Sequence, residues 1–136
     1  MGTEHPYNPW NETTFLYAAK NGNLAVIQWL RANKCPWDHR TFEFAAKNGN
    51  LENMKWLKAN HCPWNSTTFS EATRSGILEN MKWLHKAGCP INIHVIHREN
   101  CDAEALDWLD NLQTGSKGSR MIKLFRKFVS FFENPR

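Results

Sequence analysis

A repeat with a period of 27 residues constrains this chain more than any other feature of its sequence. Two tryptophan series mark the period, since the difference between successive members is 27 in both: Trp10, Trp37 and Trp64, and Trp29, Trp56 and Trp83. A fourth, imperfect copy follows Pro90. Units this short cannot bury their own apolar faces, so the repeat predicts a stack of similar units.

Each copy carries the local signals of two short helices joined by a tight turn. Asn or Asp stands before the first helix, where its side chain can accept from free backbone N–H groups; these residues are Asn11, Asp38, Asn65 and Asn92. Glycine ends this helix in three copies, and proline stops the second helix. In the first copy the pattern predicts helices near residues 12–20 and 24–33.

The predicted fold class is therefore all-α, a solenoid of about four helix hairpins with short loops over residues 1–113. We expect the tryptophans of the second helices to lie in the core; these are Trp29, Trp56, Trp83 and Trp108. The loop tryptophans, Trp10, Trp37 and Trp64, are expected to seal the joints between units.

Residues 114–136 form a second region, a linker followed by an amphipathic segment. At about 100° per residue, the apolar and basic side chains of residues 119–133 separate completely, which predicts an amphipathic helix. Such a helix has three possible uses: a cap on the last repeat, a helix that pairs with a partner or a second copy, or a helix on an anionic membrane. The pattern favours the cap.

Charge and composition narrow the possible partners. Residues 114–136 hold six Lys or Arg and one Glu, a net charge of +5, whereas the remainder holds 11 basic and 12 acidic residues, a net charge of −1. A body without a positive field is unsuited to nucleic acid. No apolar run could span a membrane and the start lacks a secretory pattern, so we expect an intracellular, cytoplasmic protein, monomeric or weakly dimeric, with reduced cysteines.

No motif of an enzyme or of a cofactor site occurs in the sequence, so we predict a protein without catalytic residues and without a cofactor. Cys35, Cys62 and Cys89 recur at one position, but stacked hairpins stand roughly 10 Å apart, too far for a shared zinc or a disulfide. His94, His97 and Cys101 have the spacing of one helix face and could hold zinc. A structural role is favoured for both sets, and no metal site is predicted.

The core of each unit, T-F-x-x-A-A-K-N-G-N-L-E-x-x-K-W-L, resembles the ankyrin repeat over about residues 9–112. Ankyrin repeats have 33 residues, and the six missing here fall in the loop that forms the projecting hairpin. The short form with a recurring C-P-W-D/N resembles the ankyrin-like arrays of giant DNA viruses, brown algae and oomycetes. The resemblance implies recognition of partners along a concave face, in the host cytoplasm for a viral protein.

Differences between the copies indicate where a partner would bind, because positions needed for packing repeat and the others vary. In and before the first helix, four positions vary: Glu12/His39/Ser66, Thr13/Arg40/Thr67, Leu16/Glu43/Ser70 and Tyr17/Phe44/Glu71. We predict a partner-binding surface containing Leu16, Tyr17, Arg40, Glu43 and Phe44, with the loop tryptophans Trp10, Trp37 and Trp64 as further anchors. By contrast, Lys20, Lys47 and Arg74 repeat at the end of the first helix, where a cation complements the helix dipole.

These observations predict a non-catalytic scaffold that binds another protein through its first helices and loops. The alternative is a membrane-associated adaptor, in which residues 119–133 bind an anionic surface and the repeats carry the cargo.

Overall fold

The computed structural model describes residues 10–113 and 127–129. Within these ranges it is all-helical and contains no strand, which confirms that the fold is all-α. Six α-helices form three hairpins: α1 (Glu12–Asn21) with α2 (Leu24–Ala32), α3 (His39–Asn48) with α4 (Leu51–Ala59), and α5 (Ser66–Ser75) with α6 (Leu78–Lys86). The expected tail helix over 119–133 lies outside the described residues, except for a helical turn at 127–129.

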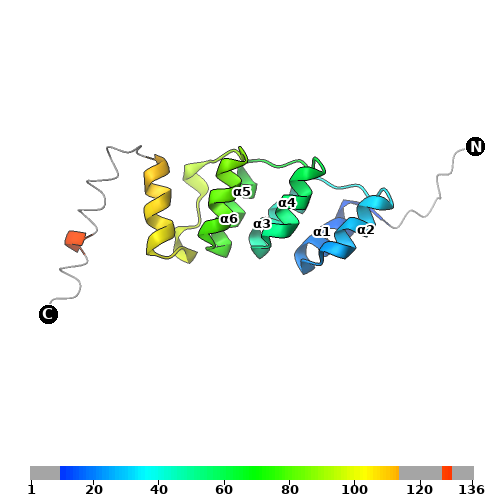
Figure 1. The fold of residues 1–136 in the computed structure, drawn as a ribbon, viewed down its shortest axis with the longest axis horizontal. Coiled ribbons are helices and arrows are strands. Elements are labelled where there is room, and N and C mark those ends of the chain that lie inside the picture. The colour runs from blue at the N-terminus through cyan, green and yellow to red at the C-terminus, as the bar shows by residue number, and fades with distance from the viewer. Residues whose placement is uncertain (1–9, 114–126, 130–136) are drawn as a thin grey trace, which may run out of the picture.

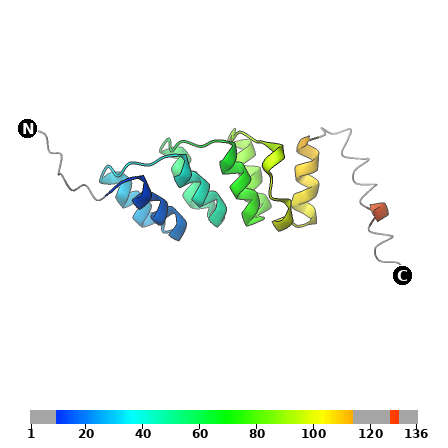
Figure 2. The same ribbon diagram turned by 180° about the vertical axis from the view of Figure 1, so that it is seen from behind.

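The hairpins stand in a row, with α1 and α2 at one end and the helix over residues 103–113 at the other (Figure 1). Seen from behind, the loops that join one hairpin to the next run along a single edge (Figure 2). The contacts between hairpins run through the first helices, since α1 packs on α3 and α3 on α5, while each second helix packs on the first helix of its own hairpin. The described residues contain no helix with the length and hydropathy that crossing a membrane requires.

Local chemistry sets the helix boundaries at the positions that the sequence predicts. The Asn11 side chain accepts from the backbone N–H groups of Thr13 and Thr14, and Asp38 and Asn65 cap α3 and α5 in the same way. Each first helix ends at a glycine in the left-handed conformation, with φ of 73° at Gly22 and 69° at Gly76.

The core lies between the two layers of helices and continues along the row. Phe15, Phe42 and Phe69, equivalent residues of the three first helices, are completely buried. Small side chains beside them let neighbouring first helices approach one another; these are Ala18, Ala19, Ala45, Ala46 and Ala72. The second helices add Ile27, Met54 and Met81 from equivalent positions.

The prediction that the helical tryptophans lie in the core is wrong for Trp29, which is 53% exposed, and only partly right for the other three. Trp56, Trp83 and Trp108 are half-buried at the edge of the core. On α2, Ile27 and Leu30 point into the core, and Trp29 lies about 100° from Leu30 around the helix axis. A tryptophan at this position of the second helix therefore lies at the edge of the core or outside it, and not within it.

The fourth copy differs from the predicted hairpin. In place of a first helix it has two 3₁₀ turns, η1 (Ile93–Val95) and η2 (Arg98–Asn100), followed by a helix over residues 103–113. The turns pack on α5 through its side chains: the Ser70 hydroxyl donates to the carbonyl oxygen of Val95, and the backbone N–H of His97 donates to Thr73 Oγ1 at 2.9 Å. Thr73 stands at the position that Ala46 has in the preceding copy. The change from Ala to Thr therefore accompanies a change of neighbour, from a helix to a 3₁₀ turn.

Candidate protein-interaction surface

The predicted partner residues of the first helices lie along what we call the first-helix surface, the solvent-facing side chains of α1, α3 and α5. Tyr17 on α1 is 65% exposed, the highest value among the large hydrophobic residues that the structure describes. Its equivalent on α3, Phe44, is half-buried, as is Leu16 beside Tyr17. An aromatic ring exposed to this extent is not used by the core.

Phe44 lines a shallow groove between α3 and α5, with a volume of about 220 Å³. The other lining residues are Glu43 and Lys47 of α3 and Glu71 of α5. Two of the four, Glu43 and Phe44, belong to the predicted set. In the sequence, Glu71 stands at a variable position but is not among the predicted partner residues, and the repetition of Lys47 favours a structural role over the binding of phosphate.

Two ion pairs flank this groove. His39 Nδ1 lies 2.7 Å from Glu43 Oε1 one turn later in α3, and Arg74 Nε lies 3.1 Å from Glu71 Oε1 in α5. The side chains of His39 and Arg74 are exposed, at 49% and 43%, whereas Glu43 and Glu71 are only 17% and 19% exposed. The two carboxylates at the groove are thus contacted by side chains that are themselves about half-exposed to solvent.

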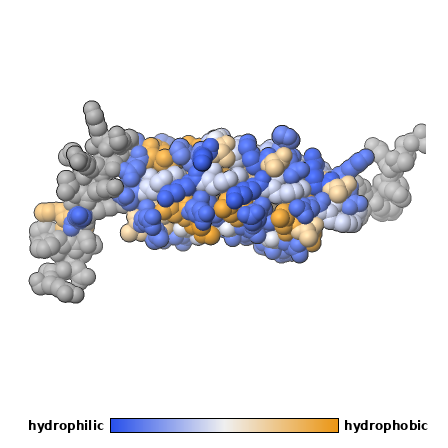
Figure 3. All heavy atoms as spheres, in the orientation of Figure 1, coloured by the Kyte–Doolittle hydropathy of each residue, from blue (hydrophilic) through white to orange (hydrophobic). Residues whose placement is uncertain are grey.

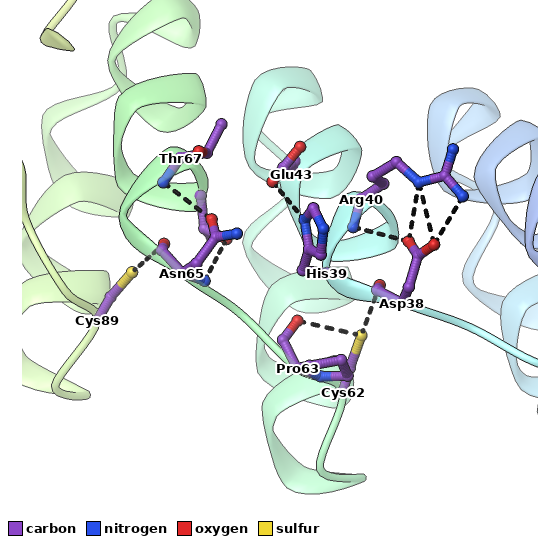
Figure 4. Close-up of polar contacts among 10 residues, drawn as sticks. Asp38, His39, Arg40, Glu43, Cys62, Pro63, Asn65, Thr67 and Cys89 are labelled. Atoms are coloured by element: carbon purple, nitrogen blue, oxygen red, sulfur yellow. Dashed lines mark hydrogen bonds and ion pairs between the residues drawn. The ribbon is translucent and has the colours of Figure 1, made fainter.

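Arg40 lies apart from the groove, because it is held by the residue that caps its own helix. Its guanidinium contacts the Asp38 carboxylate, with Nη2 2.7 Å from Oδ2, while its backbone N–H donates to Asp38 Oδ1 (Figure 4). The hydrogen bond from Arg40 lowers the pKa of Asp38 below its ordinary value. Arg40 therefore supports the cap of α3, and its exposed face is the part left to a partner.

The loop tryptophans are half-buried, and two of them, Trp37 and Trp64, seal joints between hairpins as the sequence predicts, whereas the ring contact of Trp10 lies within its own copy. The Trp37 ring lies 5.2 Å from that of Phe15 in the preceding hairpin and 5.9 Å from that of Trp56 in its own. Trp64 contacts Phe42 in the same way, at 5.2 Å, and Trp10 contacts Trp29, at 5.2 Å. The use of these rings as partner anchors stays a prediction.

Cations cover two of these rings on the loop edge. The Arg31 guanidinium lies 4.0 Å from the centre of the Trp37 ring, and the Lys58 ammonium lies 3.8 Å from that of Trp64. Both cations come from the end of the preceding second helix, so they fasten each loop to the hairpin before it.

The recurring cysteines have a structural role in the described residues. Each thiol lies within 3.5–3.8 Å of the backbone carbonyl oxygen of the residue that caps the first helix of its own copy: Cys35 with Asn11, Cys62 with Asp38 and Cys89 with Asn65. Figure 4 shows the second and third of these contacts. Burial raises the pKa of Cys62 and of Cys89 to about 12. A thiol with this pKa stays protonated near neutral pH and is a poor nucleophile or metal ligand.

The possible zinc ligands His94, His97 and Cys101 do not share a helix face, because 3₁₀ turns replace the helix that would align them. His97 contacts the Glu99 carboxylate, and the Cys101 thiol donates to the Thr73 carbonyl oxygen at 3.8 Å. Among residues 10–113 and 127–129, no three side chains of His, Cys, Asp or Glu come together as a metal site would require.

The face shown in Figure 3 is mostly hydrophilic, with apolar patches separated by polar atoms. On the opposite layer, the first-helix surface combines an exposed aromatic side chain with a groove of mixed charge, and aromatic side chains are enriched at protein interfaces. Comparisons of the chain with protein-family models, with curated proteins and with solved structures return no match.

Proposed function

We propose that this protein is a non-catalytic scaffold, an ankyrin-like solenoid that binds another protein through its first-helix surface. The observation that carries the proposal is the exposure of Tyr17, 65%, on the same row of helices in which Phe44 borders a groove. Large aromatic side chains that remain in water on a rigid helix are typical anchors of protein interfaces, because they bury a large area at a small cost in conformational entropy.

The architecture supports the same proposal. Equivalent positions on α1, α3 and α5 recur at each hairpin, while the residues at those positions differ: Tyr17, Phe44 and Glu71. A row of hairpins therefore presents a defined series of side chains on a fixed frame, which is how repeat proteins recognise extended partners.

The experiment that tests this function is quantitative affinity capture with the full chain as bait. Tyr17→Ala combined with Phe44→Ala should reduce the amount of each specifically retained protein at least tenfold, as expected when interface anchors are removed. The matched control is Val26→Ala, which removes an exposed apolar side chain, 43% accessible, from α2 on the other layer. It should leave capture unchanged.

If every retained protein binds the double variant as well as the original chain, the first-helix surface is not the binding surface. Both variants should keep their helices, because neither change alters a fully buried residue. Circular dichroism checks this directly.

A further inference from the structure

The groove between α3 and α5 combines carboxylates with an aromatic ring, a composition that suits a guanidinium. It offers two carboxylates, Glu43 and Glu71, from neighbouring helices, and the aromatic ring of Phe44. Lys47 is the one cation among the four lining residues, which leaves two negative charges against one positive. An aromatic ring with carboxylates nearby is a setting in which a guanidinium can stack and donate hydrogen bonds at the same time.

The ion pairs of the groove are easily exchanged. Both carboxylates are mostly shielded from water, but the His39 imidazole and the Arg74 guanidinium beside them are about half-exposed, and each belongs to the same helix as the carboxylate that it contacts. Exposed pairs of this kind contribute little to stability. A cation of a ligand can replace either partner, which then returns to water at a small cost.

The position of Tyr17 adds a second contact at a defined distance. It occupies on α1 the position that Phe44 occupies on α3, one hairpin away. Neighbouring packed helices stand about 8–10 Å apart. A chain in the extended polyproline II conformation advances about 3.1 Å per residue with three residues per turn, so side chains three residues apart point to the same face. Such a pair of side chains therefore matches the spacing of one hairpin of the array.

We propose that the groove binds an arginine side chain of the partner, in an extended segment that also places an apolar side chain against Tyr17, three residues from the arginine. The guanidinium stacks on Phe44 and donates to Glu43 and Glu71, while Lys47 donates to a main-chain carbonyl oxygen of the segment. This inference rests on the proposed function, because it specifies what the first-helix surface recognises.

The test begins with displayed random peptides selected for binding to the full chain, so that the ligand preference is read directly from the sequences that bind. We expect arginine to be enriched at one position and an apolar residue three positions away. A synthetic peptide of the enriched sequence is then titrated against four proteins: the original chain, Glu43→Gln with Glu71→Gln, Tyr17→Ala with Phe44→Ala, and a control variant.

The dissociation constant should rise at least tenfold for each of the two surface variants, in line with the loss of charge-assisted hydrogen bonds or of an aromatic anchor. The matched control is Glu52→Gln with Glu79→Gln, which removes two exposed carboxylates from the second helices α4 and α6 and should leave the dissociation constant unchanged. Replacing the arginine of the peptide with alanine should weaken binding to the original chain by a similar factor.

The outcomes separate this inference from the proposed function. Peptides that require Tyr17 and Phe44 but show no arginine preference, or prefer an acidic residue, overturn the arginine groove and leave the scaffold function standing. Arginine-containing peptides that bind the Glu43→Gln, Glu71→Gln variant as tightly as the original chain also overturn the groove. If no selected peptide depends on either pair of residues, both proposals fail.

Discussion

At the residue scale, the repeated cysteines join the end of each copy to its beginning through a buried thiol, with no disulfide or metal site among the described residues. The thiol at the end of a copy contacts the carbonyl oxygen of the residue that caps the first helix of that copy, as between Cys62 and Asp38. Cys62 and Cys89 are 4% and 5% exposed. A small side chain with a weak donor fits a tight apolar position beside a carbonyl oxygen that also accepts a backbone N–H of the helix, such as that of Thr41 at Asp38.

The raised pKa values of Cys62 and Cys89 predict how stability depends on pH. In the unfolded chain these thiols ionise near their ordinary pKa of 9.0, whereas burial raises it to about 12 in the folded protein. Above pH 9 the unfolded state therefore binds fewer protons, so the thiols' contribution to the free energy of unfolding should be constant below this pH and fall as the pH rises toward 12.

Chemical denaturation at a series of pH values measures this decline. In the Cys62→Ala, Cys89→Ala variant other groups still titrate, but the decline between pH 9 and about 12 should be shallower than in the original chain. Equal slopes for the two proteins would show that the thiols are not protected by the fold.

A second residue-scale device joins each hairpin to the one before it. The Asn53 side chain, completely buried, donates to the Gly22 carbonyl oxygen at 3.0 Å, and Asn80 donates to that of Gly49 at 2.8 Å. The equivalent residue of the first copy is Val26, which is 43% exposed. An asparagine thus stands at this position in the two copies whose side chain can reach the glycine carbonyl oxygen of the preceding hairpin.

This difference predicts opposite tolerances at equivalent positions. Asn80→Val should lower the free energy of unfolding by about 1–3 kcal/mol, because it leaves the Gly49 carbonyl oxygen without its donor. Val26→Asn, the reverse change at the exposed position, should change it by less than about 0.5 kcal/mol. Urea denaturation followed by circular dichroism measures both. Similar losses for the two variants would contradict a role for the amide between hairpins.

At the scale of the element, each hairpin depends on a left-handed residue between its helices, but the neighbours of that residue differ along the array. A Cβ at Gly22 would meet nothing closer than 3.9 Å, so there only the positive φ opposes a side chain. A Cβ at Gly76 would lie 2.2 Å from the backbone oxygen of Asn100 in η2. The turn that replaces the fourth first helix thus packs directly on the end of α5.

We therefore expect Gly22→Ala to lower the free energy of unfolding by about 1–2 kcal/mol, the cost of a left-handed residue with a side chain. Gly76→Ala should lower it further, because backbone atoms of the fourth copy must also move. Thermal melting compares the two variants with the original chain. A Gly76→Ala protein as stable as Gly22→Ala would mean that η2 does not hold its position against α5.

At the scale of the whole molecule, the hairpins are linked in one dimension, so their environments depend on their place in the row. The hairpin of α3 and α4 has a neighbour on each side, whereas in the described residues the hairpin of α1 and α2 packs only on the hairpin of α3 and α4. Equivalent residues also differ in burial along the row: Trp29 is 53% exposed, whereas Trp56 is half-buried.

The row predicts a gradient of local stability. Backbone amides of α1 and α2 should exchange with solvent faster than those of α3 and α4, because an end unit opens by breaking one interface and a central unit by breaking two. Hydrogen exchange followed by mass spectrometry resolves the hairpins by their peptides. Equal protection across the first two hairpins would indicate a single cooperative unit with no fraying from this end.

Much of the fold can be predicted from the sequence because the deciding interactions are local. Asn11 caps α1 through the backbone N–H groups next to it, and Gly22 turns the chain through its own φ angle, so the boundaries of the first hairpin follow from neighbouring residues. The 27-residue period adds the information that equivalent residues such as Phe15 and Phe42 share an environment, and both are completely buried.

The candidate site was predictable only in part. Tyr17 and Phe44 are apolar at positions that vary between copies, which is a signal that the sequence contains. The pairing of Glu43 with Glu71 across a groove depends on the packing of α3 against α5, and no spacing along the chain reports it.

The sequence by itself determined the units of this protein: helical hairpins of a given length, their caps, and the residues of each that face inward, because short-range hydrogen bonds and helical periodicity decide them. Only the tertiary structure decided what each unit touches. Trp29 and Trp56 are equivalent in sequence and differ in burial, and Ser70 varies because it meets the backbone at Val95. A side chain's environment is set by the neighbouring unit, and in a repeat array equal sequences receive unequal neighbours.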